Sequence, residues 1–150
     1  MIKIICIGKI KEEYLKAAIT EYLKRLSKYT KIEIIELPDE NTKEIEQCKE
    51  LEGEKILKQL KERDYVITLE IEGNSLSSTE FAYKIEQAES KGNIVFIIGG
   101  SYGLSNKIKN RSNQKISFSK MTFPHQLFRV LLLEQIYRSY KIRNNESYHK

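Results

Sequence analysis

The stretch IVFIIGGSYG, residues 94–103, decides the fold class of this chain of 150 residues. Its first five residues are apolar without interruption, which is typical of a strand covered on both faces in a parallel sheet. The glycines that follow permit positive φ angles and let backbone amides approach a ligand closely. A tight strand-to-helix turn explains these glycines equally well. Their spacing matches neither the dinucleotide-binding fingerprint nor a P-loop, so an enzyme that uses nucleoside triphosphates is disfavoured.

Strand and helix patterns alternate on both sides of this stretch. Runs of β-branched and apolar residues predict further strands at 1–7, 31–37, 65–71 and near 115–118. Apolar residues at helical spacing predict helices at 14–26, from 42 to about 63, after Ser77, at 105–111 and over a long final segment with Pro124 in its first turn. Ser77 and Glu80 form a capping-box pattern. This order predicts an α/β fold with one domain over residues 1–150, built as a mostly parallel sheet with helices on both faces, and ligands beyond the carboxyl ends of the strands.

Positive charge is concentrated in the last third of the chain. Residues 1–100 carry 16 Lys and Arg against 19 Asp and Glu, a net charge of −3, whereas residues 101–150 carry 10 against 2, a net charge of +8. Such clustering is the usual electrostatic footprint of a nucleic-acid partner. On charge alone, a solvated lysine-rich surface is an equally good explanation.

The composition also limits the compartment and the cofactors. Cys6 and Cys48 lack the paired spacing of a metal site or a disulfide framework, so both are expected to be reduced and no metal is expected. No apolar run approaches the length of a membrane span, and the first residues are too short for a signal peptide. We therefore expect a cytoplasmic protein with no membrane partner.

The last predicted helix has an unusually wide apolar surface. Apolar residues recur around its whole circumference between 127 and 140, and a small domain can cover only one side of such a helix. This breadth favours a homodimer in which a second subunit covers another side. Glu134 and Arg138 lie four residues apart, which predicts a structural ion pair.

His125 and Arg129 share a face near the start of that helix. A capping or hydrogen-bonded histidine is a somewhat better explanation of His125 than a catalytic base. Arg129 on a buried helix needs an anionic or carbonyl partner, for which a cofactor carboxylate, an RNA phosphate and a neighbouring subunit are candidates. The tail, residues 143–150, mixes cations with two rings that can stack on bases, although most chain ends are simply disordered.

Five motifs together resemble one known family across the whole chain. They are TLEIEG (68–73), LSSTEFA (76–82), FIIGGSYGLS (96–105), SFSKMTFPHQLFRVLLLEQIYRSYKI (117–142) and SYHK (147–150). The chain resembles the ribosomal RNA large subunit methyltransferase H family of the knotted SPOUT class. The resemblance implies a C-terminal trefoil knot and a homodimer with each active site at the subunit interface. General topology rules argue against a knot, so the residue patterns alone do not predict it.

The same resemblance implies the activity and the cofactor pocket. Members transfer a methyl group from S-adenosyl-L-methionine to N3 of a pseudouridine in the helix 69 loop of 23S rRNA, late and on assembled ribosomes. Carried over by motif, the cofactor-binding residues are Leu69, Gly99, Phe118, Ser119, Lys120, Met121, Thr122 and Phe123. Many members have proline and then an acidic residue or asparagine where this chain has Ser101 and Tyr102.

The sulfonium methyl is already electrophilic, so positioning matters more than a strong base. His125, Arg129, Tyr148 and His149 are therefore hypothesised as the catalytic residues, which orient the base and assist loss of the N3 proton. The hypothesised RNA-binding residues, which contact phosphates, are Arg138, Lys141 and Arg143. The alternative is a non-catalytic ribosome-associated factor that binds RNA through the same basic third. An enzyme acting on a small metabolite ranks last, because it leaves the basic tail unexplained.

Overall fold

The computed structural model describes residues 1–41 and 44–150, and the described strands form one sheet. The strands are β1 (Ile2–Ile7), β2 (Ile32–Leu37), β3 (Tyr65–Ser75), β4 (Ile94–Ile98) and β5 (Gln114–Ser117). Their order across the sheet is β2-β1-β4-β3-β5, and every neighbouring pair is parallel. The predicted α/β class is confirmed, with a sheet that is wholly rather than mostly parallel.

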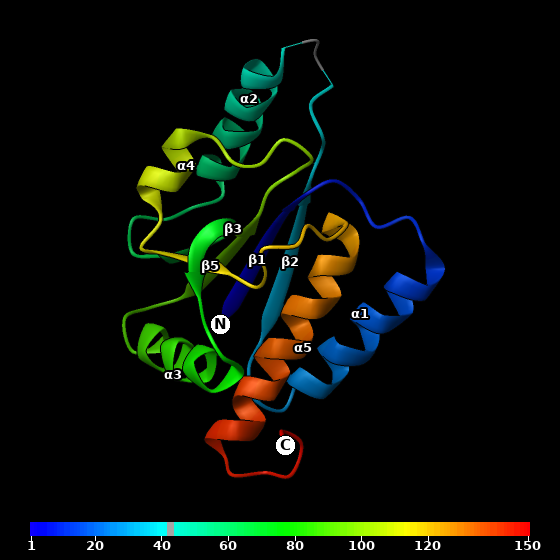
Figure 1. The fold of residues 1–150 in the computed structure, drawn as a ribbon, viewed down its shortest axis with the longest axis vertical. Coiled ribbons are helices and arrows are strands. Elements are labelled where there is room, and N and C mark those ends of the chain that lie inside the picture. Colours follow the sequence, from blue (N-terminus) through cyan, green and yellow to red (C-terminus); the bar gives the residue numbers. More distant parts are fainter. Residues whose placement is uncertain (42–43) are drawn as a thin grey trace.

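The helices cover both faces of this sheet, as predicted (Figure 1). They are α1 (Glu13–Leu26), α2 (Ile45–Lys58), α3 (Ser78–Glu89), α4 (Asn106–Arg111) and α5 (His125–Arg143). α5 packs between α1 and α3 on one face, and α2 packs with α4 on the other. Two hydrophobic clusters, one on each face, follow from this arrangement. The alternating side chains of the central strands supply both of them, so β4 is apolar along its whole length and β1 is apolar except for Lys3.

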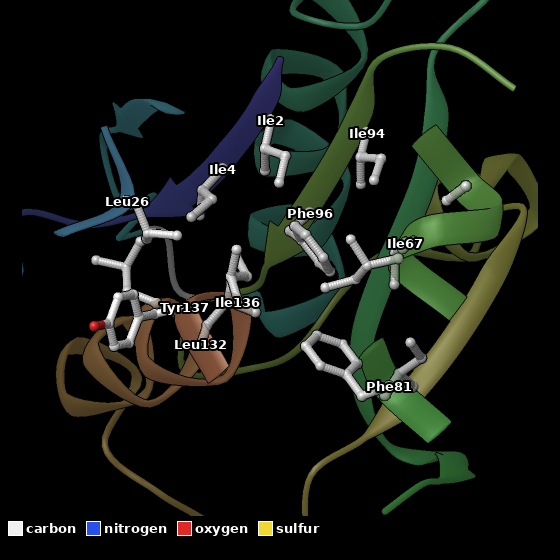
Figure 2. Packing of buried hydrophobic residues seen from close by; sticks show 14 of the residues in the cluster. Ile2, Ile4, Leu26, Ile67, Phe81, Ile94, Phe96, Leu132, Ile136 and Tyr137 are labelled. Carbon is white, nitrogen blue, oxygen red and sulfur yellow. The ribbon is translucent and has the colours of Figure 1, made fainter. Parts of the chain in front are cut away.

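The larger cluster joins the sheet to α5. Figure 2 shows Ile4 and Phe96 of neighbouring strands pointing toward Leu132 and Ile136 of the helix. All four side chains are 0% to 1% exposed. Burial of this kind contributes roughly 1.5–3 kcal/mol per large apolar side chain. It fixes the position of α5 against one face of the sheet.

The helix ends agree with the sequence-based predictions at one position and differ from them at two others. The capping box of Ser77 and Glu80 is confirmed at the start of α3, with both reciprocal hydrogen bonds present. Pro124 is the N-cap of α5 and lies just before the first turn, so that placement was wrong by one position. The helix predicted from 42 to about 63 is α2, which ends at Lys58; residues 42–43 lie outside the described residues.

β3 is longer than its sequence pattern predicts. Gly73 was interpreted as the end of the strand, but the strand continues to Ser75 with a register shift between Leu69 and Asn74. A Cβ atom on Gly73 would lie 2.7 Å from the carbonyl carbon of Ile116, so glycine allows the two backbones to pass closely. No helix in the described part of the chain has the length and apolar character to cross a membrane.

Candidate active site

A pocket of about 490 Å³ lies beyond the carboxyl ends of β4, β3 and β5, which are neighbours in the sheet. Three segments line it: 69–72 within β3, 98–104 at the end of β4 and beyond it, and 117–123 at the end of β5 and beyond it, except residue 120. Lys49 of α2, Lys109 of α4, and His125 and Phe128 of α5 also line the pocket. This is the edge of a parallel sheet at which ligands are expected to bind. Among residues 1–41 and 44–150, no group of three or more metal-ligating side chains is present.

The predicted cofactor residues converge on this pocket. Seven of the eight line it, namely Leu69, Gly99, Phe118, Ser119, Met121, Thr122 and Phe123. Lys120 does not line the pocket and is exposed to solvent. The loop after β5 is held by its own serines: Ser117 Oγ donates to the Ser119 carbonyl at 3.1 Å, and the Met121 amide donates to Ser119 Oγ at 2.9 Å.

The glycine turn after β4 forms one side of the pocket. A Cβ atom on Gly99 would lie 3.0 Å from Leu104 Cδ2 and 3.1 Å from the Gly103 carbonyl carbon, so the turn has little room for a side chain. The Gly103 amide closes the turn by donating to the Gly100 carbonyl at 3.1 Å. Gly103 has a φ of +85°, which L side chains rarely adopt. Ser101 and Tyr102, where the chain departs from the family pattern, line the pocket at the tip of this turn.

Aromatic rings form the wall opposite the glycine turn. The Phe118 and Phe128 ring centroids are 4.9 Å apart, and those of Phe123 and Phe128 are 6.2 Å apart. Such rings offer flat apolar faces to a ligand, while the loop backbone offers amide and carbonyl groups at the pocket edge. The combination suits a flat heterocycle with a polar rim.

Sequence reasoning missed Glu52, a buried carboxylate beneath the glycine turn. The residue is 5% exposed, and one of its carboxylate oxygens accepts from the Glu40 amide at 3.0 Å. Its other oxygen has no hydrogen-bond partner among the described residues and would lie 3.3 Å from a Cβ atom on Gly100. The sequence places Glu52 on an acidic helix, where it cannot be told apart from the solvent-exposed glutamates of that helix. Its burial results from the packing of α2 against the turn after β4.

The buried position of Glu52 predicts a pH-dependent effect of Glu52→Gln. Burial raises the pKa of this carboxyl above 4.5, the Glu40 amide opposes the shift, and the nearby Asp39 carboxylate adds to it. The folded state then binds the proton more tightly than the unfolded state, so the contribution of Glu52 to stability is lost as pH rises through the raised pKa. Relative to wild type, Glu52→Gln should gain free energy of unfolding between about pH 4 and about pH 7, by on the order of 1 kcal/mol.

Denaturant melts at a series of pH values measure that difference. Glu54→Gln, an exposed carboxylate on the same helix, is the matched control and should give a difference that does not change with pH. Parallel stability profiles for Glu52→Gln and wild type would contradict the prediction.

α5 places His125 and Arg129 in different surroundings. His125 lines the pocket, and its Nε2 atom lies 3.4 Å from the position of a Cβ atom on Gly8. Arg129 is 1% exposed and does not line the pocket. Its guanidinium donates to Glu36 Oε2 at 2.6 Å and to the Gly8 carbonyl at 2.7 Å. The expected anionic and carbonyl partners are therefore both supplied by the same chain, from the ends of β2 and β1.

The tail residues lie at the other end of α5. Tyr148 packs edge-on against Tyr137, with 4.9 Å between ring centroids. His149 Nδ1 lies 3.0 Å from a guanidinium nitrogen of Arg138. α5 has 19 residues and is therefore about 28 Å long. Within one chain, the tail and His125 are at opposite ends of this helix, with the tail curling back beyond its last turn (Figure 1).

The three predicted RNA-binding cations are already engaged with carboxylates of the same chain. Arg138 pairs with Glu134, which confirms the predicted ion pair. Lys141 pairs with Glu146 at 3.1 Å, and Arg143 pairs with Glu89 at 3.0 Å. An RNA phosphate bound by these residues would have to share each cation with its present carboxylate partner or displace that carboxylate.

Fold and site together define an α/β protein with a ligand-sized pocket at the carboxyl edge of a parallel sheet. The chain belongs to the SPOUT methyltransferase family: the family model described as "Predicted SPOUT methyltransferase" matches residues 1–149. The fold of this family is the α/β knot, so the predicted fold class, knot included, is confirmed.

Curated relatives match along their whole length and carry one name. The protein named "Ribosomal RNA large subunit methyltransferase H" from Clostridium tetani (strain Massachusetts / E88) is 56% identical over 157 aligned positions, which cover 99% of both chains. A protein of the same name from Clostridium botulinum (strain 657 / Type Ba4) is 55% identical with the same coverage. "Ribosomal RNA large subunit methyltransferase H 1" from Clostridium perfringens (strain SM101 / Type A) is 54% identical, also with 99% coverage of both chains.

Proposed function

We propose that this chain, acting as one domain over residues 1–150, methylates N3 of a pseudouridine in the helix 69 loop of 23S rRNA. The methyl donor is S-adenosyl-L-methionine, and the substrate is the assembled ribosome in the cytoplasm. The observation that carries the proposal is the convergence of the motif-matched cofactor residues on one pocket, in a chain whose relatives are named as large-subunit rRNA methyltransferases. The basic C-terminal third supports an RNA substrate.

The pocket has the size and chemistry for an adenosine-type methyl donor. Backbone groups around Ser119 and Met121 can bracket an adenine edge, and Phe118 can cover a ring face. A side chain at Gly99 would press on Leu104 and Gly103 and so disturb the turn that lines the pocket. The bound donor would supply an electrophilic methyl group, so the chain has to hold the acceptor base in line with it and exclude water.

A homodimer would complete this site. His125 lies at the pocket, whereas Tyr148 and His149 of the same chain contact Tyr137 and Arg138, about 18–20 Å further along the helix axis. If two copies of α5 pack antiparallel about a two-fold axis, the tail of each subunit reaches the pocket of the other. Leu127 is 37% exposed on α5 beside the pocket wall, which gives this helix an apolar residue for a partner to cover.

The proposed catalytic residues then take different roles. His125 and the partner's tail orient the target base and assist departure of the N3 proton. Burial, aided by a hydrogen bond with Tyr22, raises the pKa of Tyr148 to about 12, so its phenol acts as a hydrogen-bond donor rather than as a base. Arg129 contacts neither pocket nor solvent, and we assign it a positioning role: it holds the start of α5 against β1 and β2. Arg138, Lys141 and Arg143 remain candidates for phosphate contacts.

Transfer of labelled methyl groups from S-adenosyl-L-methionine tests this function. The expected result is incorporation into assembled ribosomes from a strain lacking this chain, with little incorporation into separate subunits or naked rRNA. The described residues form a single sheet with its covering helices, so we expect RNA recognition by them to depend on surfaces of the assembled particle. Failure to bind S-adenosyl-L-methionine at saturating concentration would favour the alternative, a non-catalytic ribosome-associated RNA-binding factor.

A further inference from the structure

The connection between β1 and α1, together with the first two residues of α1, carries two lysines and an exposed tyrosine beside the active-site pocket. We propose that this segment, residues 9–14, is an RNA-contact surface: Lys9 and Lys11 pair with phosphates, and Tyr14 stacks on an unpaired base that flanks the target nucleotide. The inference rests on the proposed function, because it assigns a second region of contact with the same RNA.

The segment lies next to the pocket in space. Figure 1 shows the connection passing over the start of α5. The Lys11 amide donates to Gln126 Oε1 at 3.3 Å, one residue from His125 in the pocket wall. His125 Nε2 in turn lies close to Gly8, at the beginning of the connection. An RNA strand that brings its target base to His125 would therefore run close to residues 9–14.

Hydrogen bonds fix the backbone of this segment. The Gly8 amide donates to the Leu37 carbonyl at 2.7 Å, and the Ile10 amide donates to Glu36 Oε2 at 2.9 Å. The buried Arg129 guanidinium donates to the Gly8 carbonyl at 2.7 Å. A connection held in this way presents its side chains from a fixed base, which lowers the entropy lost when they bind.

The two ammonium groups make no short-range polar contact within the described residues. Lys9 and Lys11 are exposed, and neither makes a hydrogen bond or an ion pair within 4 Å with a described residue; the charge of Lys9 acts on Glu36 only at longer range, where it helps to lower the pKa of that carboxyl. The Tyr14 side chain is 69% exposed and stacks on no described ring. Free cations beside an exposed ring are the chemistry by which proteins hold single-stranded RNA.

Residues 9–14 gain importance for phosphate binding because the predicted RNA-binding cations on α5 are already paired with carboxylates. Arg138, Lys141 and Arg143 each pair with a carboxylate of the same chain. Glu13, the first residue of α1, is paired with Lys16 at 3.3 Å. Among the described residues, the pocket-lining Lys49 and Lys109 are also paired, with Glu46 and Glu70 at 3.7 Å each. Lys9, Lys11 and the exposed Lys120 in the loop after β5 make no such ion pair with any residue that the structure describes.

Binding of the full-length chain to ribosomes, measured over a range of salt concentrations, tests the two lysines. Each phosphate contact with single-stranded RNA contributes about 0.7 to the slope of log affinity against log salt. The double variant Lys9→Gln/Lys11→Gln should therefore flatten the slope by about 1.4, with wild-type affinity for S-adenosyl-L-methionine. The matched control is Lys31→Gln/Lys58→Gln, which removes the same charge at the amino edge of the sheet and should keep the wild-type slope.

Tyr14 is tested by a pair of substitutions. Tyr14→Ala should weaken ribosome binding roughly tenfold, and Tyr14→Phe should restore it because the ring is retained. The control is Tyr83→Ala, which removes an exposed tyrosine on α3 and should leave ribosome binding normal. Light scattering accompanies each variant. A Tyr14→Ala chain with half the mass of wild type would place this ring in a subunit interface and overturn the stacking role.

Different results would overturn the RNA-contact surface and the proposed methyltransferase function. If wild type binds and methylates ribosomes but the lysine double variant keeps the wild-type salt slope, the contact surface is overturned and the proposed function stands. If wild type neither methylates ribosomal RNA nor binds it in a salt-dependent way, both are overturned.

Discussion

Replacing Arg129 with alanine is expected to lower the free energy of unfolding by about 3 kcal/mol. Arg129 is the largest fully buried side chain, and its removal would leave Glu36 and the Gly8 carbonyl without their shared donor. The value lies at the low end for a broken buried ion pair, because the Glu36 side chain is 33% exposed and water can partly replace the arginine. Denaturant unfolding of the two proteins measures the difference.

The pH dependence of this loss identifies its origin. Burial by itself would raise the pKa of Glu36, but hydrogen bonds from Arg129 and the Ile10 amide, with the charge of Arg129, outweigh it and hold the pKa below 4.5. The stabilisation is therefore complete above the unfolded-state value and is lost as pH falls through the lower folded-state pKa, so the gap between wild type and Arg129→Ala should narrow in acid. Lys16→Ala, which removes an exposed ion pair, should cost less than about 1 kcal/mol. Normal stability of Arg129→Ala with lost turnover would instead make Arg129 a catalytic residue.

A heterodimer of two inactive chains is expected to recover half of the wild-type activity. One chain carries Gly99→Val, which crowds Leu104 and disturbs the glycine turn of the pocket, and the other carries Tyr148→Ala and His149→Ala in the tail. If each site combines the pocket of one subunit with the tail of the other, this heterodimer contains one intact site and one doubly defective site. The homodimer of each variant should be almost inactive. Purification through two different affinity tags, followed by methyl transfer to ribosomes, measures the recovery.

The converse heterodimer is the control. A chain with all three substitutions, paired with a wild-type chain, has one defect in each shared site and should be inactive. Half of the wild-type activity in that heterodimer would show that each pocket uses the tail of its own chain, and would contradict the shared-site arrangement.

The fold was predictable from the sequence because its signals are local. The apolar run at 94–98, the Ser77 capping box and the alternation of strands with helices each depend on residues within one element. The eight cofactor residues were predicted through motif resemblance, and the structure brings seven of them to one cavity. Lys120 was the exception, because a motif does not specify toward which side of a loop each side chain points.

Contacts between distant elements were not predictable from the sequence. Glu36 lies 93 positions from Arg129, so no spacing in the sequence indicates their ion pair. Glu52 is buried only because α2 packs beneath the turn after β4. The separation of His125 from the tail follows from the length of α5 and becomes visible once the helix is built. The knot is a property of the threaded chain, and helix and strand periodicity carries no information about threading.

The most direct test is the identification of the methylated nucleoside. Ribosomes from a strain lacking this chain are compared by mass spectrometry with ribosomes from the same strain that expresses wild type or Gly99→Val. A methyl group on N3 of a pseudouridine in the helix 69 loop of 23S rRNA, present with wild type and absent with Gly99→Val, is the predicted result. A methyl group on a different nucleotide would keep the methyltransferase and contradict the assigned target, and unchanged rRNA in all three strains would contradict the proposed function.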